Sequence, residues 1–510
     1  MNIKQAKQEI ANTLKAYLSK DELGNYLIPP VRQRPVLLIG PPGVGKTQIM
    51  EQVAAETGVG LVAYTITHHT RQSAVGLPFI EKRTYGGEEY AVTEYTMSEI
   101  LASVYSLMEK TGLKEGILFL DEINCVSETL APMMLQFLQC KTFGNQRLPE
   151  GWLIAAAGNP PEYNRSVRDF DVVTLDRVKR IDVREDFAVW KEYARAKGLH
   201  GAVVSYLDIK KENFYRVETT AESLQFATAR GWEDLSELLT VYETLGLKAD
   251  REVVGQYIQL PRVARDFANY LELYNKYRKI YHVDEILKGT WRPVTVRELR
   301  AAPFDEKLSV MGLLLSRLSE AAREARRQDG LCESLHAALT SFKASLSAGE
   351  NPQEVLGALA RERREALRRA RDAGQLEKAR QTLAQLEINI LEDYRRRLIQ
   401  ENPAGSEAAM DAVRGWFGGE VEKRSSLART AKAKLDHAFA FLEETFGQGQ
   451  ELVLFVTELT AYADTSWFIE TFGCDAYFRH NRELLFDDTR RRIREEIIAV
   501  KAAEQEESHD

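Results

Sequence analysis

The residues with the clearest capacity for chemistry lie in the stretch GPPGVGKT, which fits the phosphate-binding pattern GxxxxGK[ST]. The apolar run 36–39 before it predicts a buried strand, and 46–54 predicts a helix. Glycines let successive backbone N–H groups turn toward phosphate, while Lys46 would reach the β- and γ-phosphates and the Thr47 hydroxyl would ligate Mg²⁺. The residues predicted to bind the nucleotide are Gly40, Pro41, Pro42, Gly43, Val44, Gly45, Lys46 and Thr47.

A second segment could complete the machinery for phosphoryl transfer, which needs another contact to Mg²⁺ and a group that orients the attacking water. Residues 117–120 are apolar and predict a central parallel strand, which would bring Asp121 to the metal and Glu122 to the water. An apolar run that ends in Asp-Glu is common by itself. Downstream of the phosphate-binding loop, it indicates ATP hydrolysis with Mg²⁺ as cofactor.

A third apolar run, 153–157, ends near Asn159, which by itself could be an ordinary turn residue. The chain here resembles AAA+ ATPases, and within them the MoxR group, because GPPGVGKT, LFLDEIN, AAAGNPPEYN and LDRVKRIDV occur in that group's order. The resemblance covers roughly residues 30–270. It implies an α/β P-loop core, with a parallel sheet and flanking helices, and makes Asn159 the sensor 1 residue beside the γ-phosphate.

The resemblance also assigns two arginines, for which a surface salt bridge would otherwise be the default interpretation. Arg177 occupies the arginine-finger position, from which it would reach the nucleotide of a neighbouring subunit, although Arg180 and Lys179 lie close enough to compete for that role. Arg230 matches sensor 2 at the start of a lid helix, in a short pattern that many arginines fit by chance. The predicted catalytic residues are therefore Lys46, Glu122, Asn159, Arg177 and Arg230, and the predicted metal ligands are Thr47 and Asp121.

A hairpin is predicted over 79–95, with Gly86-Gly87 at its turn. AAA+ proteins of the clade that contains MoxR carry a hairpin at this point, facing the central pore. Its tyrosines would either grip a substrate or only decorate the hairpin surface, and the sequence favours neither; they are Tyr85, Tyr90 and Tyr95. A second hairpin is predicted over 141–149. His68 and His69 lack a third metal ligand and predict a solvated loop.

Composition favours a large cytoplasmic protein. With 510 residues, 44% hydrophobic and 28% charged, the chain can bury a large core in two or three domains. A net charge of -8 gives no general attraction to nucleic acid. The first ten residues lack the apolar region of a signal peptide, and no membrane span is expected. The cysteines have no metal-binding spacing and predict reduced, mostly packed thiols; they are Cys125, Cys140, Cys332 and Cys474.

Three regions are expected along the chain: an α/β ATPase core with hairpin insertions over 1–185, an α-helical lid over 186–285, and an all-α accessory or partner-binding domain over 286–510. In the last region, breaks in the helices are predicted at 402–406 and 415–419. The arginine-rich run 361–371 is interleaved with acidic residues and predicts a solvated, salt-bridged face, and the acidic tail 504–510 is predicted to fray. A coiled-coil or helical-hairpin seam is predicted at Leu376, Ala379, Leu383, Leu386 and Ile390.

These features predict an ATPase that remodels or activates another protein. The resemblance implies a homo-oligomeric ring, usually a hexamer, and often a partner with a von Willebrand factor A domain. A nucleic-acid motor or restriction-type NTPase on the same core is the alternative, and the acidic charge and lack of a clear basic patch argue against it. A third possibility is a nucleotide-gated scaffold with little turnover, which would not need the full set of Glu122, Asn159 and Arg177.

Overall fold

The computed structural model describes residues 1–68, 70, 72, 74, 76–143, 146–163, 167, 170–219, 224–375 and 378–482. Backbone contacts divide the chain into two units. Unit 1 comprises Met1–Val189, Thr228–Arg230 and Ser341–Ser406, and unit 2 comprises Trp190–Ala227, Gly231–Thr340 and the residues from Glu407 onward. Four features named above lie outside the described residues: His69, the 144–145 turn of the second hairpin, Leu376 and the acidic tail 504–510.

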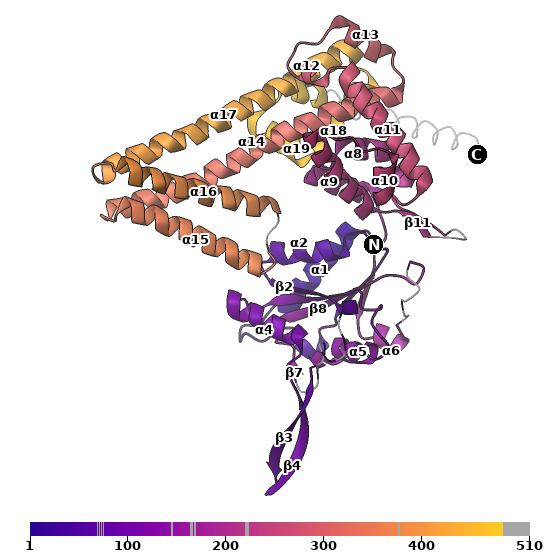
Figure 1. The fold of residues 1–510 in the computed structure, drawn as a ribbon, viewed down its shortest axis with the longest axis vertical. Helices are drawn as coiled ribbons and strands as arrows, with labels where there is room; N and C mark the ends of the chain where they lie inside the picture. The colour runs from indigo at the N-terminus through magenta and orange to yellow at the C-terminus, as the bar shows by residue number, and fades with distance from the viewer. Residues whose placement is uncertain are drawn as a thin grey trace, which may run out of the picture. The chain divides into compact units, whose positions relative to one another are not determined.

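A five-stranded parallel sheet forms the centre of unit 1 (Figure 1). The register aligns Ile39 with Gly158 and with Asp182, so the carboxyl ends of the strands meet at one edge of the sheet. This arrangement confirms the predicted α/β class. In spatial order the strands are β2 (Gly60–Thr65), β5 (Gly116–Asp121), β8 (Trp152–Gly158), β1 (Val36–Ile39) and β9 (Lys179–Asp182).

The inner strands β1, β5 and β8 are largely apolar because helices cover both faces of the sheet. Alternate residues of β1 belong to different cores: Leu37 packs in one with α4 and α5, whereas Val36 and Leu38 pack in the other with α1 and α2. The helices are α1 (Ile3–Leu18), α2 (Lys46–Thr57), α4 (Glu99–Thr111) and α5 (Ala131–Cys140). Shorter elements of unit 1 are η1 (Pro30–Arg32), η2 (Ile66–His68) and α6 (Val172–Leu175).

Both predicted hairpins are present in unit 1. β3 (Pro78–Tyr85) and β4 (Glu88–Tyr95) pair antiparallel, and Figure 1 shows them projecting from the sheet. Their turn residues Gly86 and Gly87 have φ values of 62° and 94°, which glycine adopts without steric cost. The second hairpin pairs β6 (Thr142–Phe143) with β7 (Gln146–Arg147).

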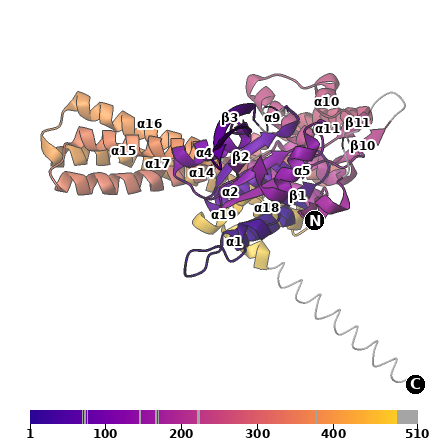
Figure 2. The ribbon, with the colours of Figure 1, turned by 90° about the horizontal axis from the view of Figure 1, so that it is seen from below.

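Two helices from late in the chain, α15 (Pro352–Asp372) and α16 (Lys378–Glu401), form a hairpin that also belongs to unit 1 (Figures 1 and 2). The predicted salt-bridged face is present, since Arg364 pairs with Glu392 at 3.1 Å and Arg368 with Asp372 at 3.9 Å. The predicted helical hairpin is present, but its predicted seam is only partly buried: Ala379 is exposed, whereas Leu383, Leu386 and Ile390 are half-buried. The buried apolar residues of α16 are Ile388, Leu391, Tyr394 and Leu398, and those of α15 lie near its start, at Val355, Leu356 and Ala360.

The connection between α15 and α16 lies against the edge strand of the sheet. The Leu61 N–H of β2 donates to the carbonyl of Ala373 at 3.2 Å, and Gln375 Nε2 donates to the carbonyl of Val59 at 3.0 Å. Gly374, at φ 69°, brings the turn close enough that a Cβ there would lie 3.3 Å from Leu61 Cβ. The α15–α16 turn thus bonds to backbone groups at an edge of the sheet with which no other described strand pairs.

In its described residues, unit 2 consists of helices and loops apart from a hairpin of β10 (Arg216–Thr219) and β11 (Leu224–Ala227). Its core includes Tyr206, Trp232 and Phe267, whose rings meet at centroid distances of 5.1–5.7 Å. Its helices, four of which extend into unit 1, are α7 (Phe187–Lys197), α8 (Gly201–Ile209), η3 (Lys211–Asn213), α9 (Ala229–Leu245), α10 (Arg251–Tyr257), α11 (Pro261–Ile280), α12 (Val283–Leu287), α13 (Pro293–Ala301), α14 (Phe304–Ser347), α17 (Gly405–Phe446), α18 (Gln450–Ala461) and α19 (Ala463–Phe472).

One of the two predicted helix breaks is present and the other is wrong. The chain leaves α16 at Glu401 and starts α17 at Gly405, as predicted, but α17 continues without interruption through 415–419. Three helical glycines cost about 3 kcal/mol relative to alanine. Packing against α14 offsets this cost, because Gln328 donates to Glu420 Oε2 at 2.7 Å and Arg424 pairs with Asp329.

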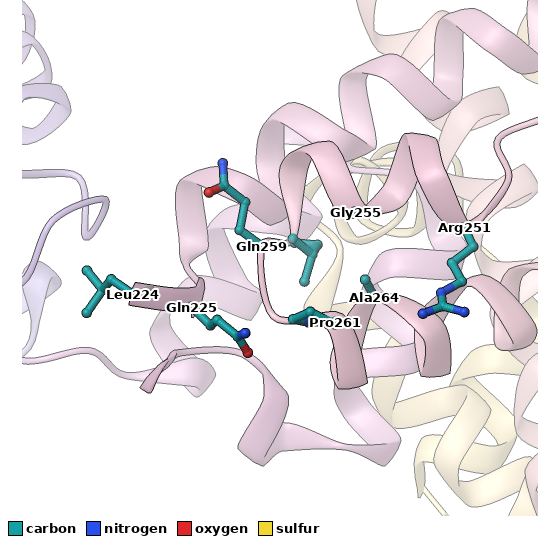
Figure 3. A pocket seen from close by; sticks show the side chains of 8 residues that line it. Leu224, Gln225, Arg251, Gly255, Gln259, Pro261 and Ala264 are labelled. Atoms are coloured by element: carbon teal, nitrogen blue, oxygen red, sulfur yellow. The ribbon is translucent and has the colours of Figure 1, made fainter. Parts of the chain in front are cut away.

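A pocket of about 420 Å³ lies in unit 2, where β11 meets α10 and α11 (Figure 3). Arg251 is the charged residue in its wall, and none of the predicted site residues lines it. Its lining residues are Leu224, Gln225, Arg251, Gly255, Ile258, Gln259, Pro261 and Ala264. Among the helices that the structure describes, none is both long and apolar enough to cross a membrane.

Candidate active site

The phosphate-binding motif forms the predicted turn between β1 and α2. Gly43 and Gly45 have φ values of 77° and 91°, in the left-handed region that residues with a Cβ rarely adopt. Gly45 is also the N-cap of α2, and its carbonyl accepts the first helical bond from Ile49 at 3.1 Å. The loop therefore ends at the positive end of a twelve-residue helix, a position suited to phosphate.

The Lys46 side chain is held over this loop and is only 8% exposed. Its ammonium donates to the carbonyl oxygens of Gly40 at 2.7 Å and Pro41 at 2.9 Å, and to Asn159 Oδ1 at 2.9 Å. Burial lowers the pKa of Lys46 to about 8. The amine thus keeps its charge at neutral pH while most water is excluded, which strengthens its attraction for phosphate.

Two oxygens suited to Mg²⁺ lie side by side next to the loop. Thr47, in the first turn of α2, donates its hydroxyl to Asp121 Oδ2 at 2.8 Å, and Asp121 is the last residue of β5. Mg²⁺ prefers oxygen ligands and usually binds through one or two protein groups, with water and phosphate completing its shell. These two residues and the glycine-lined loop therefore fit ATP with Mg²⁺.

Glu122 follows Asp121 with its backbone in the left-handed region, at φ 57°. This conformation costs about 1–2 kcal/mol for a residue with a Cβ, and such strain is concentrated at functional sites. Two contacts hold it: the Glu122 N–H donates to Asp121 Oδ1 at 2.9 Å, and Thr67 Oγ1 donates to Glu122 Oε2 at 2.9 Å. Thr67 comes from η2, directly after β2, and sequence analysis did not identify it.

Asn159 lies just beyond the end of β8, and its side chain points to Lys46, to which it is bonded. Its backbone is held by another asparagine. Asn124 Nδ2 donates to the carbonyl of Asn159 at 2.8 Å, and the Asn159 N–H donates to Asn124 Oδ1 at 3.3 Å. Asn124 belongs to the LFLDEIN motif, so a signal was present in the sequence, but the motif by itself gives this residue no role.

Arg177 lies in a different environment from the loop residues. It follows α6, is exposed, and donates to Gln139 of α5. Among the described residues it has no bond to the other predicted site residues. The two basic residues that follow it closely have ionic partners within the chain, since Arg180 pairs with Asp182 at 2.9 Å and Lys179 with Glu9 at 2.5 Å.

Arg230 groups with unit 1 and lies beside the phosphate loop. A Cβ placed on Gly43 would be 3.3 Å from the Cβ of Arg230. The positive charge of Arg230 also adds to the effect of burial on the pKa of Lys46, whereas Asp121 and Glu122 oppose that effect. The structure therefore brings Arg230 to the same loop as Lys46, on an exposed side chain.

Comparison with known proteins places the core in a family. Residues 36–175 match the model of the ATPase family associated with various cellular activities, AAA. No curated protein matches the chain. Among solved structures, NtrX from Brucella abortus, determined in complex with ADP, is similar over 40% of this chain and 44% of its own, at 16% identity and a TM-score of 0.24. A similarity of that size indicates nothing further about this chain. From the family match, residues 36–175 form an AAA domain, which supports ATPase activity.

Proposed function

We propose that this ATPase is of the MoxR type, acts in the cytoplasm, and couples Mg²⁺-dependent hydrolysis to remodelling or activating a client protein. The exposed β3–β4 hairpin is the observation that supports a protein client. Exposed apolar side chains gathered on one element are typical of protein-binding surfaces. On this hairpin they are Phe79, Ile80, Tyr85 and Tyr90, with exposed fractions of 46, 77, 53 and 52%.

Each residue of the site has a distinct role in this proposal. Lys46 binds the β- and γ-phosphates, Thr47 and Asp121 hold Mg²⁺, and Glu122 orients the attacking water. Bound Mg²⁺ supplies neutralisation of the phosphate charge. Asn159 senses the γ-phosphate, which it can approach because its amide already lies beside Lys46 at 2.9 Å. Arg230 acts from the loop side as sensor 2.

Ring assembly, as a hexamer, is the second part of the proposal. Arg177 would act as the finger toward a neighbouring subunit, since it is exposed while Arg180 and Lys179 are engaged in ion pairs. The α6 helix before Arg177 exposes Val172 by 81% and Val173 by 56%, which suits a surface that a second copy covers. The core, lid and accessory regions predicted over 1–185, 186–285 and 286–510 are part of the proposal, with the last region binding a partner such as a von Willebrand factor A domain.

The ring is tested by mixing two inactive variants. Glu122→Gln should keep ATP affinity and lose turnover by roughly 10²–10⁴-fold, and Arg177→Ala should lose about 10³-fold. A mixed ring contains interfaces in which an intact Glu122 faces an intact Arg177, so activity should partly return. Arg180→Ala is the matched control and should stay active. Co-assembled rings without recovery would mean that Arg177 acts within its own subunit or is structural.

The protein client is tested against the nucleic-acid alternative through ATPase stimulation. We expect unfolded casein to stimulate turnover, and the triple change Ile80→Ser, Tyr85→Ser and Tyr90→Ser to remove the stimulation without changing the basal rate. Duplex DNA should have no effect. Stimulation by DNA at 50 mM salt that falls steeply by 200 mM would reveal phosphate contacts and favour the nucleic-acid motor instead.

A further inference from the structure

The turn after β5 is tied to the end of β8 by more than the sheet itself. β5 ends at Asp121, yet two residues later the Ile123 N–H still donates to the carbonyl of Ala157 in β8 at 2.9 Å. The next residue, Asn124, is 5% exposed and continues this pairing with its side chain. Its amide accepts from the N–H of Asn159 and donates to the carbonyl of Asn159, so it bonds to both backbone groups of one residue.

Gly158 allows this approach. A Cβ at Gly158 would lie 2.5 Å from Asn124 Oδ1 and 2.8 Å from its Cγ, distances that real Cβ atoms do not reach. Any other residue at 158 would therefore displace the Asn124 amide. Gly158 at the end of β8 and Asn124 after β5 thus pack directly against each other, and this contact fixes where the chain leaves the sheet.

The backbone of Asn159 in turn determines where its side chain can reach. Asn159 Oδ1 accepts from Lys46 Nζ at 2.9 Å. A shift of the Asn159 backbone would move its amide away from Lys46, and misplacements of about 1 Å are costly at catalytic centres. Asn124 itself bonds to the Asn159 backbone on one side and follows the Asp121–Glu122 pair on the other, so it links the two strand ends that meet at the nucleotide.

We infer that Asn124 is a positioning residue for ATP hydrolysis, which holds the Asn159 backbone so that the Asn159 amide stays beside Lys46 and the γ-phosphate. This inference rests on the proposed role of Asn159. Asn124 touches no reacting atom, so its loss should lower kcat more than it weakens ATP binding. A residue that only stabilises the fold would instead lower the unfolding temperature and leave kcat of the folded fraction intact.

The test compares Asn124→Ala, Asn159→Ala and the double variant by kcat, by the Kd of a fluorescent ATP analogue and by thermal unfolding. We expect Asn124→Ala to lower kcat by roughly 10–100-fold with Kd within about threefold of wild type, and the double variant to be no slower than Asn159→Ala, because both act through one amide. Asn213→Ala is the matched control: Asn213 is 6% exposed, donates to the Tyr206 hydroxyl at 2.8 Å, and should affect stability alone.

Asn124→Asp is a second test variant, which keeps the side-chain volume and is measured by the pH dependence of its activity. The ionised carboxylate accepts from the Asn159 N–H but cannot donate to the Asn159 carbonyl, whereas the protonated form can donate again. Burial raises a carboxyl pKa, so the activity of this variant relative to wild type should rise as pH falls from 7.5 to 5.5.

The outcomes separate this inference from the proposed function. A normal kcat in Asn159→Ala would overturn the sensor role of Asn159 and with it the inference. A slow Asn159→Ala beside a normal Asn124→Ala would overturn the inference alone. Additive losses in the double variant, or a flat relative pH profile for Asn124→Asp, would also show that Asn124 does not act through Asn159.

Discussion

Two regions of unit 1 join distant parts of the chain in different ways. At the nucleotide site, the contacts are hydrogen bonds made by particular side chains: the Lys46 ammonium donates to carbonyl and amide oxygens, and the Thr47 hydroxyl donates to the Asp121 carboxylate. At the edge of the sheet, the α15–α16 turn bonds to β2 mainly through backbone groups, with Ala373 accepting from Leu61. The first contact depends on residue type and the second on shape, so only the first leaves a motif in the sequence.

Replacing the ammonium at the nucleotide site should have the largest effect. Lys46→Ala removes the only charged group bonded to the loop carbonyls among the described residues, so binding of ATP should be lost, and turnover with it. Fluorescent nucleotide titration and phosphate release measure the two quantities. Lys110→Ala, on the exposed side of α4, should leave both unchanged. Retained affinity in Lys46→Ala would mean that the loop backbone alone suffices.

This difference explains which parts of the nucleotide site could be predicted from the sequence. Strands β1, β5 and β8, the loop and the hairpins were predictable, because apolar runs, glycines and acidic residues have fixed uses there. Thr67 was not, since a threonine after a strand signals nothing until Glu122 is placed beside it. The roles of the site residues and the three-region division stay predictions.

The C-terminal helices show where sequence patterns stop being informative. α16 carries apolar side chains on more than one face, and their spacing alone does not tell which face becomes buried in the folded protein. The glycines at 415–419 indicate a break by propensity, but α17 continues because its contacts with α14 outweigh that preference. The buried face of α16 and the continuity of α17 both depend on contacts with residues distant in sequence, which a local sequence pattern does not specify.

At the sheet edge, the backbone conformation of the α15–α16 turn can be tested with a matched pair of glycines. Gly374→Val forces a β-branched residue to φ 69° and against Leu61, whereas Gly349→Val meets the same backbone cost at φ 85° with no atom within 4 Å. Each should lose about 1–2 kcal/mol in the free energy of unfolding. Only Gly374→Val should also speed hydrogen exchange at the Leu61 amide. Equal exchange in both variants would argue against the β2 contact.

Raising the pH should weaken nucleotide binding by an intermediate amount. Because burial lowers the pKa of Lys46 to about 8, most of this amine is neutral at pH 9 and cannot pair with phosphate. The apparent Kd for ATP should therefore rise about tenfold between pH 7 and 9. Stability responds in the opposite direction: the unfolded chain keeps this proton up to its ordinary pKa of 10.5, so this group's contribution to the free energy of unfolding rises between pH 8 and 10.5.

The control for the pH effect is Lys46→Arg, whose guanidinium stays charged throughout this range. Its affinity, whatever its absolute value, should not change between pH 7 and 9. A parallel loss of affinity in wild type and Lys46→Arg would assign the pH dependence to another group.

The smallest effect is expected from the side-chain bond at the sheet edge. Gln375→Ala removes the bond from Gln375 Nε2 to the Val59 carbonyl and should cost about 0.5–1.5 kcal/mol in urea unfolding. Gln385→Ala, which alters only a local bond to Asn389 on α16, is the control and should cost less. Equal costs would indicate that the α15–α16 turn gains nothing from this side chain.

The covered edge of β2 also has a consequence for how the protein is made. An open strand edge can pair with another chain and begin aggregation. On the ribosome, Leu61 precedes Ala373 by roughly 310 residues, so at about 5–20 residues per second the edge waits roughly 15–60 s for its cover. The β2 edge of the nascent ATPase core is thus open to pairing with other chains for most of the time that the whole chain takes to be synthesised. Shortening the chain before α15 would make that exposure permanent, with loss of soluble yield as the visible result.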